Sequence, residues 1–369
     1  MKILLTKLLF LFSISLLAQV PPITIEPYGG NKKATVSEQI GIVKIEISYN
    51  RPGVKGREGK IWNTSVAHYG FVDLGHGTSY AAPWRAGANE NTTVSFSHPV
   101  KIEGKDLPAG KYGFFIALGE NGSTLIFSKV NNSWGSFYYD ETMDALRVTV
   151  KNESLDKSVE WLTYDFSGET DSTAVVAMSW EKRRIPFTVV VERKKLQIEA
   201  FKNDFRITRP YYDFMDAAYW CVRNNYDLEQ ALKWMDRAIY FRVMGEKNFR
   251  SLSAKAAVLT KMNRLEEAKK VMDEALPMGE INDVHFYGRT LLGENQPKEA
   301  FKVFKLNYDK HPDDFTTNVG MARGYSAIGD YKKAQTYLKI ALPKAPDEAN
   351  KTRVQEMSKR LEKGEDINK

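Results

Sequence analysis

Most of the side chains that could take part in chemistry lie in one stretch, residues 50–91. This stretch is rich in glycine and polar residues. A loop of this length between compact strands is uncommon unless it is functional or disordered. It offers imidazole, carboxylate, guanidinium and indole groups, which could hold a metal ion, transfer protons or bind a polar ligand. The residues concerned are Arg57, His68, Asp73, His76, Trp84, Arg85, Asn89 and Glu90.

Residues 50–91 could form a metal site or the active site of a hydrolase. His68, Asp73 and His76 are possible metal ligands, but their spacing matches no established motif and a fourth ligand is not evident. A hydrolase of glycan or peptide would pair Glu90 with Asp73 or Asp140, with His68 also in the site. The sequence has no Gly-x-Ser-x-Gly elbow, no His-Glu-x-x-His pair and no phosphate-binding glycine loop. We therefore expect no metal and no cofactor, and we favour a non-catalytic protein while keeping the hydrolase as the alternative.

Binding of a sugar ring or a peptide is a third possibility, because aromatic residues occur next to glycine and asparagine. Trp84, Trp134, Tyr138 and Tyr139 have this setting, although such residues more often belong to the core of a β-sandwich. Arg85 and Glu90 could also form a buried ion pair that fixes the loop against the sheet. The candidate ligand-binding residues are Arg51, His68, Trp84, Arg85, Asn89, Glu90 and Trp134.

The elements around this stretch are predicted to be β-strands. Apolar and polar residues alternate within residues 43–49, 94–102 and 112–118, which is typical of strands with one buried face. The dipeptide Asn121-Gly122 favours a tight turn between two such strands. Eight or nine short strands without an intervening helix predict an all-β antiparallel sandwich with a jelly-roll-like arrangement.

One string within the β region resembles a known family. Residues 84–93, Trp-Arg-Ala-Gly-Ala-Asn-Glu-Asn-Thr-Thr, resemble the signature of an exported bacterial family, domain of unknown function 2911, which is common in Bacteroidota. Residues 49–52, 107–112 and 134–140 are similar to the same family, so that the resemblance spans roughly residues 25–190. The segment 70–83 is longer than the family pattern. The resemblance implies a β-rich fold and export, and it implies no activity.

Four alanines in the second half of the chain are almost equally spaced, with intervals of 37, 32 and 34 residues (268−231, 300−268 and 334−300). A period of this size is typical of stacked helix pairs. The surrounding pattern resembles the tetratricopeptide repeat over residues 211–346, in about four units. The alanines are Ala231, Ala268, Ala300 and Ala334.

Repeats of this type usually bind a peptide along the inner face of the first helix of each pair. Counting back from each alanine places several basic residues on or near that face. Such a row would suit an acidic segment or a chain-terminal carboxylate, because guanidinium binds carboxylate through two parallel hydrogen bonds. The alternative is a solvated face with local ion pairs within each helix. The candidate partner-binding residues are Arg223, Arg250, His285, Arg289 and Arg323.

Residues 1–18 are predicted to be a secretion signal. Lys2 and Lys7 precede an apolar core that is too short to span a bilayer, and Ala18 before Gln19 suits cleavage. We therefore expect a periplasmic or secreted protein without a transmembrane segment in the mature chain. The predicted parts that follow are a β-sandwich at 19–192, a connector at 193–210, repeats at 211–346, and a capping helix and tail at 347–369.

The net charge and the cysteine count bear on the partners of the protein and on its disulfides. The net charge of +7 comes without a dense basic patch, so we expect no nucleic-acid binding. Cys221 is the only cysteine, and the chain therefore has no internal disulfide. The sequence predicts an exported, non-catalytic binding or assembly protein. Its repeats would dock a protein or peptide partner, and its β domain would bind a small ligand or a second partner.

Overall fold

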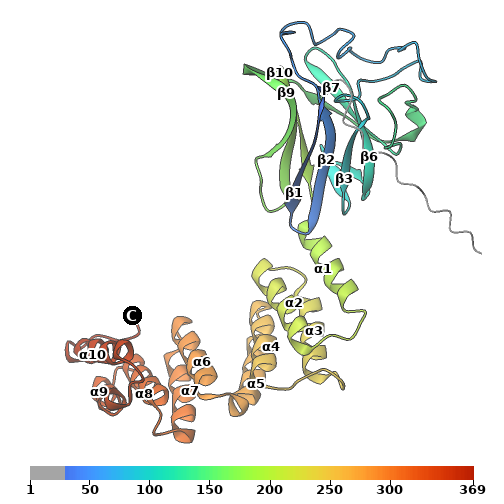
Figure 1. Ribbon diagram of the computed structural model, residues 1–369. Helices are drawn as coiled ribbons and strands as arrows, with labels where there is room; N and C mark the ends of the chain where they lie inside the picture. Colours follow the sequence, from blue (N-terminus) through green and yellow to red (C-terminus); the bar gives the residue numbers. More distant parts are fainter. Residues whose placement is uncertain (1–29) are drawn as a thin grey trace, which may run out of the picture. The chain divides into compact units, whose positions relative to one another are not determined.

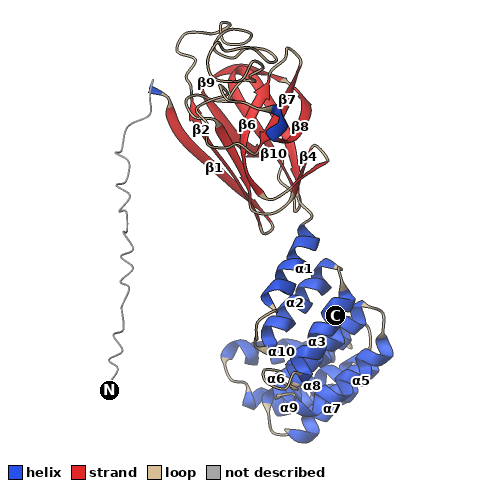
Figure 2. Ribbon diagram, turned by 90° about the vertical axis from the view of Figure 1, so that its right-hand side faces the viewer, coloured by secondary structure: helices blue, strands red, loops and turns tan. Residues whose placement is uncertain are grey.

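The structure is a computed structural model that describes residues 30–369, so the predicted signal at residues 1–18 lies outside the described residues. The described residues divide into two compact units, 30–196 and 197–369, and the strands precede the helices (Figures 1 and 2). This order confirms the predicted fold class of a β domain followed by paired helices. In the part that the structure describes, no helix has the length and apolarity needed to cross a membrane.

The β domain consists of two sheets in which each pair of neighbouring strands is antiparallel. The six-stranded sheet has the order β1-β2-β3-β6-β7-β8, and the four-stranded sheet has the order β5-β4-β10-β9. The ten described strands are Lys32–Ile40 (β1), Val43–Arg51 (β2), Thr92–Phe96 (β3), Val100–Ile102 (β4), Lys105–Leu107 (β5), Gly110–Ala117 (β6), Gly122–Ser128 (β7), Asp144–Lys151 (β8), Glu153–Ser167 (β9) and Thr173–Val190 (β10).

The core of this domain lies between the two sheets. In β2 the predicted alternation is observed, with Ile45 and Ile47 fully buried and Lys44 exposed. Phe114 of the larger sheet contacts Phe187 of the smaller sheet, with 5.8 Å between their ring centroids. Burying a large apolar side chain contributes about 1.5–3 kcal/mol, so contacts of this kind hold the two sheets together.

Residues 52–91 form a long loop that is packed into the domain. Short bridges tie it to the sheets, including Trp84 to Ile116 and Gly53 to Trp161. The Trp84 ring is 4% exposed and stacks on Trp180 of β10 at 6.1 Å between centroids. The loop is therefore an ordered part of the sandwich, and its polar side chains are held in defined positions.

The second unit contains paired helices, seen side by side in Figure 1. The first helix, α1, lies in the predicted connector, and α10 is the predicted capping helix. The helices are Arg193–Asp204 (α1), Tyr211–Asn224 (α2), Leu228–Tyr240 (α3), Phe249–Lys261 (α4), Leu265–Ala275 (α5), Ile281–Gly293 (α6), Pro297–Lys310 (α7), Phe315–Ala327 (α8), Tyr331–Ala341 (α9) and Glu348–Glu362 (α10), with short 3-10 turns at Leu276–Met278 and Leu342–Lys344.

The repeat is visible in the backbone as well as in the sequence. The four periodic alanines lie on α3, α5, α7 and α9, and all are buried. The turn inside each pair contains a glycine or asparagine with a left-handed backbone, a conformation open mainly to these two residue types, and the turn between α2 and α3 also contains the left-handed Asp227. The glycine and asparagine residues are Asn225 (φ 46°), Asn263 (φ 61°), Asn295 (φ 59°) and Gly329 (φ 84°). Small residues also permit close helix crossings, since a Cβ at Gly288 would lie 2.6 Å from the Phe304 ring.

Candidate functional site

A basic cluster lies where α6 meets α8. His285 and Arg289 are four residues apart and share one face of α6, and Arg323 lies on α8. Burial and, to a lesser extent, the like charges of Arg289 and Arg353 lower the pKa of Arg323 to about 10, while the charge of Asp366 opposes this shift. The guanidinium of Arg323 is therefore partly desolvated and is repelled by the positive charges of Arg289 and Arg353.

His285 is the buried member of this cluster. Its side chain is 8% exposed, and its Nδ1 atom is buried without a hydrogen-bond partner. Burial lowers the pKa of His285 to about 4, with further contributions from the charges of Arg323 and Arg289. At neutral pH the imidazole is thus uncharged, and the positive charge of the cluster comes from the arginines.

The C-terminal tail covers the α8 side of the cluster. The Oγ of Ser326 donates to Oδ1 of Asp366 at 2.8 Å and accepts from the backbone nitrogen of Ile367 at 3.0 Å. Ile367 is 5% exposed and packs with the apolar residues of α8, α9 and α10. His285 and Arg323, two of the five predicted partner-binding residues, are thus largely covered. The other three, Arg223, Arg250 and Arg289, are exposed.

The arginines of this face are not engaged in local ion pairs. Among the described residues, neither the four predicted arginines nor Arg353 has a carboxylate oxygen within the 4.0 Å limit for an ion pair. Basic residues elsewhere in the helices do form such pairs, for example Arg264 with Glu267 and Lys305 with Asp309. In the described structure these arginines thus lack the local helix ion pairs of the alternative, although Arg223, Arg250 and Arg289 are exposed to solvent as it expects.

Two of the predicted ligand-binding residues in the β domain hold the fold together. The Nε of Arg51 donates to the carbonyl oxygen of Leu162 at 2.8 Å, and its Nη2 donates to the Thr163 hydroxyl at 2.7 Å. These bonds connect β2 to β9. Trp84 is buried in the core, as described above, so its ring has no open face for a ligand.

The predicted ion pair between Arg85 and Glu90 does not form in the described structure. Instead, Nη1 of Arg85 donates to the carbonyl oxygen of Asn89 at 3.0 Å, and its guanidinium lies over the Phe137 ring at 5.1 Å. Burial lowers the pKa of Arg85 and also that of His68, where the charge of Arg85 adds to the effect. Glu90 binds the Asn50 amide at 2.6 Å.

A polar pocket of about 200 Å³ lies beside Glu90. Asn50, which is 2% exposed, donates to Glu90 and accepts from Asn89 at 3.4 Å. Amides both donate and accept hydrogen bonds, so the pocket suits a small polar ligand. Its lining brings the predicted ligand-binding residue Glu90 together with residues that are not among the predicted ones: Lys33, Ser48, Tyr49, Asn50, Asn91, Thr93, Lys111, Asn131 and Asn132.

The residues named for metal binding or hydrolysis have separate surroundings. Oδ1 of Asp73 accepts from the backbone nitrogen of Gly75 at 2.8 Å, and the His76 ring contacts Phe137. Within residues 30–369 no group of three or more His, Cys, Asp or Glu side chains could hold a metal ion. Burial raises the pKa of the Cys221 thiol to about 12, which keeps it protonated and unreactive at neutral pH.

The match to a family model coincides with the β domain. Residues 31–189 match the model of a family described as "Protein of unknown function (DUF2911)". One similar solved structure is the "Crystal structure of YrrB: a TPR protein with an unusual peptide-binding site", at 16% identity, covering 47% of this chain and 86% of that chain with a TM-score of 0.28. No match was found among curated proteins. The chain therefore carries a domain that matches the DUF2911 family at residues 31–189, followed by paired helices.

Proposed function

We propose that this chain is an exported, non-catalytic binding protein whose paired helices dock an acidic segment of a protein partner. The single observation that supports this role is the cluster of like charges at Arg289, Arg323 and Arg353, which lowers the pKa of the partly buried Arg323 although the charge of Asp366 opposes that shift. Proteins seldom bring desolvated cations together without an anion, because each cation raises the free energy of the others. A carboxylate from a partner would lower that free energy and would bind a guanidinium through two hydrogen bonds.

Arg289 is the residue that a partner would reach first. It is exposed on α6, whereas the guanidinium of Arg323 is partly buried behind the tail. Positive potential from the cluster would also attract an acidic segment over several ångströms and speed its association. The predicted row of Arg223 and Arg250 on α2 and α4 would extend the same surface toward the first repeats.

The tail itself supports the kind of occupant that we propose. Asp366 and Asn368 contact α8 through a carboxylate and an amide, and Ile367 fills an apolar site between them. This face of α8 thus accepts an extended segment in which acidic or amide groups flank an apolar residue. The partner segment would likewise present acidic or amide groups beside an apolar residue, and these would contact the neighbouring face of α6.

The proposal is tested by titrating a fluorescein-labelled Glu-Gly repeat peptide into the full chain and following fluorescence anisotropy. Replacement of Arg289 by Ala removes a hydrogen-bonded charge and should weaken binding about tenfold. Lys302→Ala is the matched control, because it removes the same charge from α7, where Lys302 is paired with Glu299. Equal affinities of wild type and Arg289→Ala would reject the proposal.

For the β domain we propose binding of a small ligand or a second partner. The pocket beside Asn50 and Glu90 supports this role, because it combines a buried amide with an exposed carboxylate in a defined position. Glu90→Gln preserves the shape of the side chain and removes its charge, so a ligand bound here through that carboxylate should lose affinity in this variant.

A further inference from the structure

The exposed aromatic side chains of the β domain are concentrated on two loops. In the described part of this domain, the large hydrophobic side chains that are exposed number four, and all are aromatic. The two loops are tied together, since the backbone nitrogens of Thr78 and Ser79 both donate to the carbonyl oxygen of Phe137 at 3.0 Å. The four residues are Phe71 (41% exposed), Tyr80 (83%), Trp134 (46%) and Tyr138 (58%).

A pocket of about 490 Å³ lies between these loops. Phe71 and Tyr80 form its aromatic side, and Asp140, Glu141 and Arg147 form its polar side. It shares no lining residue with the pocket beside Asn50. A pocket that combines exposed aromatic faces with a few fixed polar groups is typical of a ligand site.

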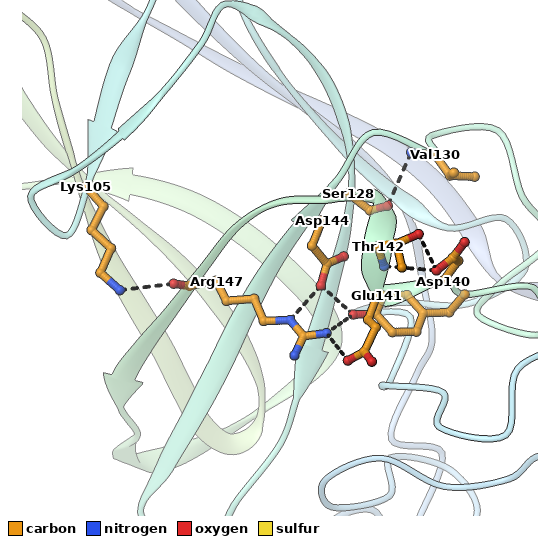
Figure 3. Close-up of polar contacts among 9 residues, drawn as sticks. Lys105, Ser128, Val130, Asp140, Glu141, Thr142, Asp144 and Arg147 are labelled. Carbon is orange, nitrogen blue, oxygen red and sulfur yellow. Dashed lines mark hydrogen bonds and ion pairs between the residues drawn. The ribbon is translucent and has the colours of Figure 1, made fainter.

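The polar side of the pocket is held in place by a network of hydrogen bonds (Figure 3). Arg147 donates through Nε to Oδ2 of Asp144 at 2.6 Å and through Nη2 to the Tyr139 hydroxyl at 2.7 Å. The Tyr139 hydroxyl donates to the same Asp144 oxygen at 2.6 Å. Such a network fixes the guanidinium before a ligand arrives and lowers the entropic cost of binding.

The network also sets the charge that a ligand would meet. Arg147 is neutralised by the half-buried Asp144, and its Nη2 lies 3.4 Å from Glu141. Asp140 accepts from the backbone nitrogen and the hydroxyl of Thr142 through one oxygen, Oδ1. Exposed carboxylate oxygens at Asp140 and Glu141 can thus accept hydrogen bonds from a ligand, and their charges would repel an anion.

From this geometry we infer that the pocket binds an uncharged saccharide. The C–H face of a pyranose ring would lie against Tyr80 and Phe71, because aromatic rings bury large apolar areas at a low cost in conformational entropy. Sugar hydroxyls would donate to the carboxylates of Asp140 and Glu141. The inference goes beyond the small-ligand role proposed above, because it concerns a second pocket of the β domain, and it is independent of the peptide-binding role of the helices.

The test uses the full chain and three neutral hexasaccharides, namely maltohexaose, cellohexaose and chitohexaose, with isothermal titration calorimetry as the readout. At least one should bind saturably, and Tyr80→Ala should weaken that binding about tenfold through loss of the exposed aromatic face. Tyr80 is 83% exposed, so this variant should fold normally. Tyr212→Ala is the matched control, since it removes another exposed tyrosine from α2 and should leave saccharide binding unchanged.

Four results would overturn the inference. The first is that none of the three oligosaccharides binds, and the second is that binding is the same in wild type and Tyr80→Ala. The third is binding to phosphatidylcholine vesicles that Tyr80→Ala abolishes, which would assign these aromatic residues to a lipid surface. Saccharide binding that is lost in Glu90→Gln and kept in Tyr80→Ala would place the ligand in the pocket beside Asn50. That last result would reject this site and retain the proposed function of the domain.

Discussion

Arg323 and Asn368 hold each other through two hydrogen bonds. Nη1 of Arg323 donates to Oδ1 of Asn368 at 3.2 Å, and Nδ2 of Asn368 donates to the carbonyl oxygen of Arg323 at 3.0 Å. The last residues of the chain thus contact Arg323, whose guanidinium the proposed partner would bind together with that of Arg289. Any partner that contacts Arg323 must first displace this tail or bind beside it.

Removal of residues 366–369 should therefore expose Arg323 and strengthen binding of the Glu-Gly peptide. Loss of the two hydrogen bonds between Arg323 and Asn368 should by itself contribute about 1 kcal/mol, which corresponds to roughly a fivefold gain in affinity. Fluorescence anisotropy measures this gain, and Asn368→Ala should give a smaller change in the same direction. If the truncated chain binds the peptide more weakly than wild type, the tail belongs to the binding surface instead of competing with it.

Ile367 should stabilise the helical unit in addition to holding the tail over Arg323. Its side chain is 5% exposed, so Ile367→Ala leaves a cavity against α8 and α10. We expect a loss of about 2–4 kcal/mol in the free energy of unfolding of the helical unit, measured by denaturant titration. Lys369→Ala, at an exposed position of the same tail, should leave the free energy unchanged.

The helical unit should lose stability in acid through His285. Folding lowers the pKa of His285 from the usual 6.5 to about 4, so the unfolded chain binds more protons between these values. Stability from this residue is thus highest above pH 6.5 and falls as the pH drops toward 4, by on the order of 3 kcal/mol at the lower end. Thermal unfolding at several pH values, compared between wild type and His285→Gln, isolates this residue from the carboxylates. Parallel pH profiles for the two proteins would contradict the expectation.

Trp84 should be a structural residue. Its ring is buried and packs against Trp62 and Trp180, with 6.2 and 6.1 Å between the ring centroids. Trp84→Ala should cost about 3–5 kcal/mol in the free energy of unfolding of the β domain. A variant with normal stability and impaired ligand binding would instead support the role that the sequence suggested.

The strands and the helix repeat could be predicted because both follow from periodic patterns. Alternation placed Ile45 and Ile47 inside, and the equal spacing of buried alanines such as Ala300 and Ala334 located the helix pairs. Periodicity indicates which face of an element is buried. It does not indicate how irregular segments turn, and the candidate sites depend on such segments.

The Arg85–Glu90 pair illustrates that limit. Ala86 and Asn89 both have left-handed backbones, with φ of 54° and 57°, and these turns direct the two side chains to different neighbours. Nothing in the residue types predicts a left-handed alanine, because its Cβ makes that conformation unfavourable. The position of Ile367 was missed for a related reason, since one apolar residue in a polar tail gives no periodic signal.

Charge reversal at Arg289 is the most direct test of the central claim, that the helical unit binds acidic segments through unpaired arginines. The measurement is the anisotropy of labelled Glu-Gly and Lys-Gly peptides titrated with wild type and with Arg289→Glu. Wild type should bind the Glu-Gly peptide and not the Lys-Gly peptide, and Arg289→Glu should lose most of the first affinity and gain measurable affinity for the second. If Arg289→Glu keeps the wild-type preference for the Glu-Gly peptide, the account is contradicted.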